Sequence, residues 1–212
     1  MNSYFVTATG TDTGKTFCTA GLLRANPSLR AIKPLLSGYS PEHDEGSDPG
    51  LLLAAMGQAV TSEAIAAVTP WRYQAPLSPD MAAAQEGQSI DYEALIGFCR
   101  VELAKGPTLI EGAGGAAVPL TGVKLTADWI ADLNLQVLLV SGTYLGSISH
   151  CITTAEFLLR RGISIHAILL NESTDAPVST EETQAALARY LPCRMFIVKR
   201  NAAPEDFKGL EL

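Results

Sequence analysis

The sequence predicts an α/β fold in which one parallel β-sheet has helices on both faces. Short, continuously apolar runs alternate along the chain with stretches of helical periodicity. Strands that are apolar at consecutive positions must be covered on both sides, which is typical of parallel sheets. No segment rich in proline, glycine and serine divides the chain, so we expect residues 1–212 to form a single domain.

Six strands are expected, at Tyr4–Thr9, Ala31–Lys33, Thr108–Glu111, Gln136–Ser141, Ile163–Leu170 and Met195–Val198. A helix is expected after Asp91, where apolar residues recur at helical spacing: Tyr92, Leu95, Ile96, Cys99 and Leu103. The spacing of Ser179 and Glu182 is that of a capping box, which predicts another helix start. Ligands of parallel sheets bind where strands end, so the residues after each apolar run are the site candidates.

Composition excludes several classes of protein. Of the 212 residues, 47% are hydrophobic and 17% are charged, which excludes intrinsic disorder. The net charge is −7 without any basic stripe, so nucleic acid is not an expected partner. The apolar runs are far shorter than the ~20 residues of a membrane span, and the first residues do not resemble a secretion signal. We therefore expect no membrane association and a cytoplasmic location, with the four widely spaced cysteines reduced.

A phosphate-binding loop follows the first expected strand. The segment ends in Gly14-Lys15-Thr16 and leads into a helix-compatible stretch, which is the context of a P-loop. In such loops backbone N–H groups surround phosphates, the lysine reaches the β- and γ-phosphates, and the threonine hydroxyl binds Mg²⁺. The strict pattern has glycine where Thr9 stands, so the loop is a variant.

Polar residues also follow the next two expected strands. Lys33 and Ser37 come after the second strand, and Glu111 ends the third, where P-loop proteins have a second Mg²⁺ ligand that is usually aspartate. Asp48 precedes a short apolar helix and, taken alone, is better interpreted as its N-cap. The three histidines lack partners at metal-binding spacing, so no zinc site is expected, and local hydrogen bonds are their expected role.

Together these segments resemble the dethiobiotin synthetases, ATP-dependent enzymes that close the ureido ring in biotin synthesis. The resemblance covers nearly the whole chain. Its motifs are Gly10–Thr16, Lys33–Gly38, Pro76–Ala83, Ala127–Trp129, Glu111–Gly115 and Leu145–His150. The sequence departs from the family at Ala8, where glycine is usual, at Asp80, where histidine is frequent, and at Ser149, where asparagine is frequent.

The resemblance implies ATP as co-substrate and Mg²⁺ as cofactor, with Thr16, Asp48 and Glu111 as metal ligands. It implies catalytic roles for Lys15 and Lys33. The implied nucleotide contacts are Asp12, Thr13, Gly14, Lys15, Thr16, Phe17, Asp48, Glu111, Gly112, Ala113, Gly114, Asn171 and Glu172. The implied substrate contacts are Ser37, Leu145, Gly146 and Ser149, with the Leu145–His150 segment contributed by the second subunit of a homodimer.

The reaction implied by the resemblance converts CO₂, 7,8-diaminopelargonate and ATP to dethiobiotin, ADP and phosphate. Two alternative functions fit the sequence less well. A related P-loop amide synthase acting on a cobalamin precursor needs a glutaminase domain, for which 212 residues are too few. A partitioning-type ATPase switch has a second, signature lysine early in the loop, and none stands between Ala8 and Thr13. A nucleotide-binding protein without a defined reaction is the least specific alternative.

Overall fold

A computed structural model, which describes residues 2–210 and 212, is built around a parallel sheet. Within these residues the sheet has six strands, in the spatial order β2-β5-β1-β6-β7-β8, and every neighbouring pair is parallel. The strands are β1 (Tyr4–Ala8), β2 (Arg30–Ile32), β5 (Thr108–Glu111), β6 (Gln136–Gly142), β7 (Ile165–Asn171) and β8 (Met195–Val198). The predicted α/β class is confirmed, and each expected strand is present within two residues of its predicted bounds.

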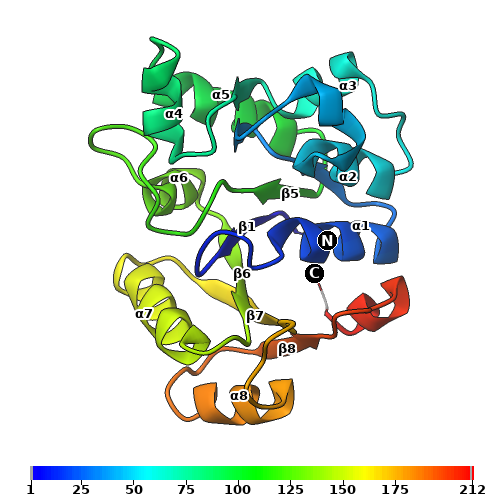
Figure 1. Ribbon diagram of the computed structural model, residues 1–212, viewed down its shortest axis with the longest axis vertical. Coiled ribbons are helices and arrows are strands. Elements are labelled where there is room, and N and C mark those ends of the chain that lie inside the picture. The colour runs from blue at the N-terminus through cyan, green and yellow to red at the C-terminus, as the bar shows by residue number, and fades with distance from the viewer. Residues whose placement is uncertain (1, 211) are drawn as a thin grey trace.

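Helices cover both faces of this sheet. One face packs against α1 (Lys15–Ala25), α2 (Asp48–Ala55) and the 3₁₀ segment η2 (Pro204–Gly209). The other packs against α5 (Tyr92–Leu103), α6 (Thr126–Leu133), α7 (Ser147–Arg160) and α8 (Thr180–Leu187). Neighbouring residues of one strand enter opposite cores, as Tyr4 and Phe5 do, because successive strand side chains point to opposite faces. In Figure 1 the segments from α2 to α5 lie above β5, and α7 and α8 lie at the β7–β8 end.

The expected helix starts are present with their capping contacts. The Asp91 carboxylate accepts a hydrogen bond from the Ala94 N–H at 2.9 Å, and Ser179 and Glu182 cap each other reciprocally. The N-cap of α2 is Ser47, whose hydroxyl oxygen accepts from the Gly50 N–H at 3.2 Å. The interpretation of Asp48 as that N-cap is therefore wrong.

A second, two-stranded parallel sheet was not predicted. It pairs β3 (Leu35–Ser37) with β4 (Trp71–Tyr73), and each strand has only three residues, too few to show an alternating pattern. The remaining elements are η1 (Pro41–Gly46), α3 (Ser62–Val68) and α4 (Pro79–Gln85). Of the helices in the described part of the chain, none is long and apolar enough to cross a membrane. Three of the four free cysteines are buried, and Cys193 is partly exposed.

The order of the strands brings the polar strand ends together. β2 and β5 are neighbours, and Ile32 pairs with Ile110, so the next residues, Lys33 and Glu111, lie side by side. β1 follows on the other side of β5, and its end opens the P-loop. Because all these strands are parallel, their carboxyl ends meet at one edge of the sheet, where the site is expected.

Candidate active site

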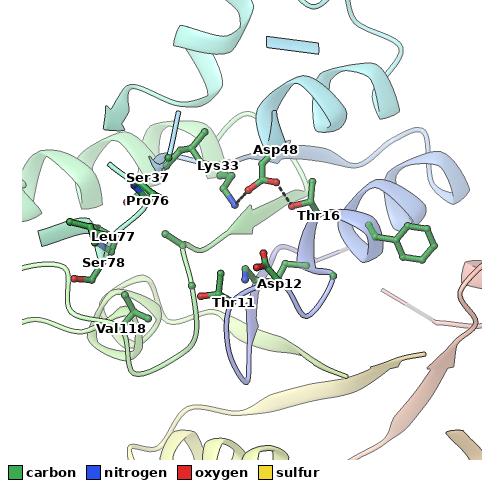
Figure 2. A pocket seen from close by; sticks show the side chains of 18 residues that line it. Thr11, Asp12, Thr16, Lys33, Ser37, Asp48, Pro76, Leu77, Ser78 and Val118 are labelled. Carbon is green, nitrogen blue, oxygen red and sulfur yellow. Dashed lines mark hydrogen bonds and ion pairs between the residues drawn. The ribbon is translucent and has the colours of Figure 1, made fainter. Parts of the chain in front are cut away.

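A cavity of about 870 Å³ lies at this edge. Figure 2 shows Ser37, Pro76 and Leu77 on one side of it and Thr11 and Asp12, from the P-loop, on the other. Eight lining residues were not among the predicted site residues: Thr11, Leu36, Gly38, Pro76, Leu77, Ser78, Pro79 and Val118. The Pro76–Pro79 segment could have been inferred, because it belongs to a motif of the resemblance, whereas Val118 stands in a loop without any sequence signal.

The backbone of the P-loop explains its departures from the strict pattern. Ala8 belongs to β1, and neither it nor Thr9 has a left-handed φ, so neither position needs glycine. The left-handed positions are Asp12, with φ of 55°, and Gly14, with φ of 93°. A Cβ on Gly14 would stand 2.1 Å from the Asn171 side-chain nitrogen, so glycine is required at this position by both conformation and space.

Replacement of Gly14 by alanine should therefore destabilise the fold. The left-handed conformation alone costs an alanine about 1–2 kcal/mol, and displacement of the Asn171 amide adds to this. Urea unfolding measures the loss. Gly10→Ala is the matched control in the same loop, because Gly10 has no left-handed φ and a Cβ added there would meet no atom within 4 Å. We expect the control to stay within about 0.5 kcal/mol of the wild type; equal losses in both variants would contradict this explanation.

Four side chains from four segments form a hydrogen-bonded cluster, in which Thr16, Lys33 and Asp48 line the cavity and Glu111 is buried behind them. The Thr16 hydroxyl lies 2.9 Å from Asp48 Oδ1 and 2.7 Å from Glu111 Oε1. The Lys33 ammonium donates to Glu111 Oε1 at 2.8 Å and forms an ion pair with Asp48 Oδ2 at 2.5 Å. Figure 2 shows Lys33, Asp48 and Thr16 joined in this way. Three of the residues lie at the start of α1, after β2 and at the end of β5, while Asp48 is the first residue of α2.

Burial and charge oppose each other in this cluster. Glu111 is fully buried and Lys33 is 2% exposed. Burial alone would lower the pKa of Lys33, but the Glu111 and Asp48 carboxylates outweigh it, so that pKa is raised. Burial also opposes ionisation of Asp48, yet Lys33 and Thr16 hold its pKa below the usual value. Lys15, in contrast, forms no ion pair with a carboxylate in the described part of the chain, and burial together with the charge of Lys33 lowers its pKa to about 8.

The donor set fits a divalent cation that binds with a nucleotide. Glu111 Oε2 is buried and has no hydrogen-bond partner, and the Thr16 hydroxyl has one proton for two carboxylate acceptors. Across residues 2–210 and 212, no group of three His, Cys, Asp or Glu side chains could hold a metal ion by itself. Mg²⁺ typically binds through one or two carboxylates together with waters and substrate phosphates. Asp48, Glu111 and Thr16 provide that partial set.

A second unpaired polar atom faces the same region. The Ser37 hydroxyl oxygen is buried without a hydrogen-bond partner, and Ser37 lines the main cavity and an adjoining hollow of about 410 Å³. Buried polar groups normally have partners, so this hydroxyl is available to a ligand. Lys15 lines the same cavity, and its ammonium lies 3.4 Å from the Gly10 carbonyl oxygen.

Asn171 and Glu172 lie behind the P-loop and not in the cavity lining. The Asn171 amide donates to the Thr13 carbonyl at 3.0 Å, and Glu172 accepts from the Arg200 backbone N–H at 3.1 Å. Nearby, Lys199 is paired with Glu181 at 2.7 Å, and the Arg200 guanidinium donates to the Thr174 hydroxyl.

Leu145, Gly146 and Ser149 are not brought to the cavity of this chain. They stand at the start of α7, where Gly146 is the N-cap and Leu145 is 85% exposed. The nearby His150 ring nitrogen shares a 2.8 Å hydrogen bond with the Tyr144 hydroxyl, which agrees with the local role expected for this histidine. Ten of the predicted site residues line the cavity, namely Asp12, Gly14, Lys15, Thr16, Phe17, Lys33, Ser37, Asp48, Ala113 and Gly114, whereas Thr13, Glu111 and Gly112 are not among the lining residues.

The parallel sheet, the loop after β1 and the carboxylate at the end of β5 define a P-loop nucleoside triphosphatase. A family model described as an AAA domain matches residues 2–198. Proteins named ATP-dependent dethiobiotin synthetase BioD are 46% identical over 198 residues in Acidiphilium cryptum, 42% over 211 in Methylobacterium nodulans and 45% over 184 in Caulobacter vibrioides. The alignments cover 90%, 94% and 84% of this chain and 89%, 94% and 83% of the relatives. The chain belongs to the ATP-dependent dethiobiotin synthetase family and is an enzyme of the ligase class.

Solved structures with a similar fold come from other P-loop proteins. The cell division ATPase MinD of Pyrococcus furiosus has a TM-score of 0.53 at 15% identity, covering 95% of this chain and 84% of its own. A ParA family ATPase from Chlorobium tepidum has a TM-score of 0.55 at 14% identity, covering 99% and 90%. At such low identity these likenesses support the fold alone, so they do not favour a partitioning-type switch.

Proposed function

We propose that this chain uses ATP to join CO₂ to the two amines of 7,8-diaminopelargonate, giving dethiobiotin, ADP and phosphate. The observation that supports this most directly is the cluster of Lys33, Glu111, Asp48 and Thr16, which shares one cavity with the P-loop and the unpaired Ser37 hydroxyl. An ATP-dependent carboxylation needs a phosphate site and a cation facing the same space, and this cavity offers both.

The proposed reaction has three steps that balance without a protein nucleophile. One amine attacks CO₂ and loses a proton, which leaves a carbamate. A carbamate oxygen attacks the γ-phosphorus of ATP and ADP leaves, giving a carbamic–phosphoric anhydride. The second amine attacks the carbamate carbon and loses a proton, phosphate leaves, and the ureido ring closes. Carbamate and triphosphate are both anionic, so catalysis requires positioning and charge stabilisation. Lys15 and Lys33, which both line the cavity, are proposed to provide this.

Mg²⁺ fits the same proposal, with Thr16, Asp48 and Glu111 as the residues that would hold it. Bound there with the nucleotide, it would neutralise charge on the β- and γ-phosphates. The unpaired Glu111 Oε2 supports this assignment. Ser37, with its free hydroxyl, is proposed to contact the diamine or its carbamate. Because the co-substrate is ATP, we place the enzyme in the cytoplasm.

The direct test is incubation with diaminopelargonate, bicarbonate, ATP and Mg²⁺, followed by mass analysis for dethiobiotin. We expect ¹³C-bicarbonate to label the product at one carbon. Release of phosphate should require the diamine, CO₂ and Mg²⁺ together. Phosphate release at an equal rate without the diamine, and without product, would indicate an ATPase of another function.

We also propose that the enzyme is a homodimer in which α7 of one subunit completes the cavity of the other. The predicted substrate residues Leu145, Gly146 and Ser149 are displayed at the start of α7, and the 85% exposure of Leu145 leaves a large apolar side chain available for an interface. We expect light scattering at micromolar concentration to give a dimeric mass. Leu145→Asp should weaken the dimer and raise KM for the diamine together. A fully active monomer would contradict this proposal.

Nucleotide selectivity should be modest. One donor of the Asn171 amide is engaged by the Thr13 carbonyl, which leaves its oxygen as an acceptor and its second N–H as a donor. The exocyclic amines of adenine and cytosine match the acceptor, and the carbonyl of guanine matches the donor. We expect kcat/KM with CTP and with GTP each to lie within ~10³-fold of that with ATP, about 4 kcal/mol. Steady-state kinetics with each nucleotide measures this, and a larger preference for ATP over CTP would show further base contacts.

A further inference from the structure

Lys33 and the proposed cation share the same two carboxylates. The ammonium lies 2.8 Å from Glu111 Oε1 and 2.5 Å from Asp48 Oδ2, and these are the two carboxylates assigned to the divalent cation. The contact with Glu111 is shielded from water, since Glu111 is fully buried and Lys33 is 2% exposed, whereas the Asp48 side chain is 36% exposed. Figure 2 shows the lysine reaching across to Asp48 beside Thr16.

We propose that Lys33 is a built-in counter-ion which a divalent cation must displace, so that cation binding and release of Lys33 toward the substrates are one event. This inference rests on the proposed function for the cation assignment. A carboxylate that accepts from an ammonium can also bind a metal, through either oxygen, only if the two cations come within several ångströms of each other. Such like charges repel strongly where water is scarce. Loss of at least one Lys33 contact therefore accompanies occupancy.

The surroundings determine where a displaced Lys33 can move. The segment after Lys33 and the β5 end are packed in the core, whereas the main cavity is the open space that Lys33 lines. Its ammonium then faces that cavity, where Ser37 and the P-loop also lie. An ammonium that has lost an anionic partner attracts the next available anion, which is a phosphate or carbamate group. Displacement by the cation thus makes the Lys33 ammonium available to the substrates only after the cation has bound.

The proposal differs from a general charge effect in a testable way. Lys15 is a second buried cation on the same cavity, but its ammonium contacts the Gly10 carbonyl and neither carboxylate. Removal of either lysine lowers the positive charge near the cation site by one. Only removal of Lys33 also removes a competitor for the carboxylate oxygens. Lys15→Met is therefore the matched control for Lys33→Met.

The experiment titrates each protein with Mn²⁺ alone, without nucleotide, and follows free Mn²⁺ by electron paramagnetic resonance. We expect Lys33→Met to bind Mn²⁺ at least about 10-fold more tightly than the wild type, as loss of one charged hydrogen bond to the carboxylates predicts. Lys15→Met should show a clearly smaller gain. Thermal unfolding with and without Mn²⁺ is the second readout, and Lys33→Met should gain more stability from the metal than the wild type does.

Lys33→Gln keeps a neutral hydrogen-bond donor and is used if the methionine variant does not fold alone. A variant that folds only when Mn²⁺ is added would support the proposal, because the metal then replaces the lysine charge. Equal Mn²⁺ affinity in the wild type and the Lys33 variants would overturn the proposal. An equal gain in Mn²⁺ affinity in Lys15→Met would also overturn it, as would Lys33 variants that stay unfolded when Mn²⁺ is added. None of these readouts depends on ring closure. The counter-ion proposal can therefore fail for a protein that makes dethiobiotin, and it can hold for a protein that makes none.

Discussion

Replacement of Lys33 by alanine should lower kcat/KM for the diamine by about 10²–10³-fold at saturating Mg²⁺, the usual loss when one charge-stabilising group is removed. The physical reason is that Lys33 is a buried cation that lines the same cavity as the P-loop, where two anionic reactants must approach each other. The change should appear mainly in kcat, because the charge on the reacting carbamate and phosphate grows after binding. Steady-state kinetics with coupled detection of ADP measures it.

Lys105→Ala is a suitable control for that variant. Lys105 also pairs with a carboxylate, that of Glu102, but its side chain is 52% exposed and it does not line the cavity. We expect its kcat/KM to stay near the wild-type value. Unfolding of Lys33→Ala must be followed at the same Mg²⁺ concentration, since the variant leaves two carboxylates without their ammonium. A folded Lys33→Ala protein within threefold of wild-type activity would show that Lys33 is only a structural partner of Glu111 and Asp48.

The sequence was sufficient for the parts of the site that lie directly on strand ends. Lys33 and Glu111 could be proposed because apolar runs mark β2 and β5, and the parallel arrangement places both ends at one edge. The Gly14-Lys15-Thr16 motif similarly located the phosphate loop. The positions of these residues could be predicted because strand period and loop chemistry are local properties of the chain, while their roles in binding and catalysis stay predictions.

The parts that could not be predicted depend on distant packing. Ser47 and Asp48 are both residue types that suit an N-cap, so the local sequence does not distinguish them. In the structure Asp48 contacts Thr16 and Lys33 at the cavity, and Ser47 caps α2. The β3–β4 pair joins segments more than 30 residues apart through three-residue strands, which leaves no periodic signal. Val118 reaches the cavity only because its loop folds back along β1, with the Ala116 N–H bonded to the Ala8 carbonyl.

Replacement of Glu111 by glutamine should affect both stability and catalysis. Glu111 is fully buried, and its Oε1 receives contacts from Lys33 at 2.8 Å and Thr16 at 2.7 Å. The amide has the same size but no charge, so a buried ammonium loses one of its two carboxylates. Breaking a fully buried pair costs ~3–5 kcal/mol; we expect about 2–3 kcal/mol here, because Asp48 still partners Lys33. Activity should fall by about 10³-fold, since a proposed metal ligand is lost as well.

Asp48→Asn separates these two effects. Asp48 contacts the same Lys33 and Thr16, but its side chain is 36% exposed, so water can replace part of what the carboxylate provided. We expect its free energy of unfolding to fall by only about 1 kcal/mol. Its activity should nevertheless fall about as far as that of Glu111→Gln, and higher Mg²⁺ should restore part of it, because both carboxylates are proposed to hold the cation. If activity instead followed stability across the two variants, the cluster would be a structural ion pair and the cation would bind elsewhere. Urea unfolding and Mg²⁺ titrations of kcat/KM on both proteins decide between these outcomes.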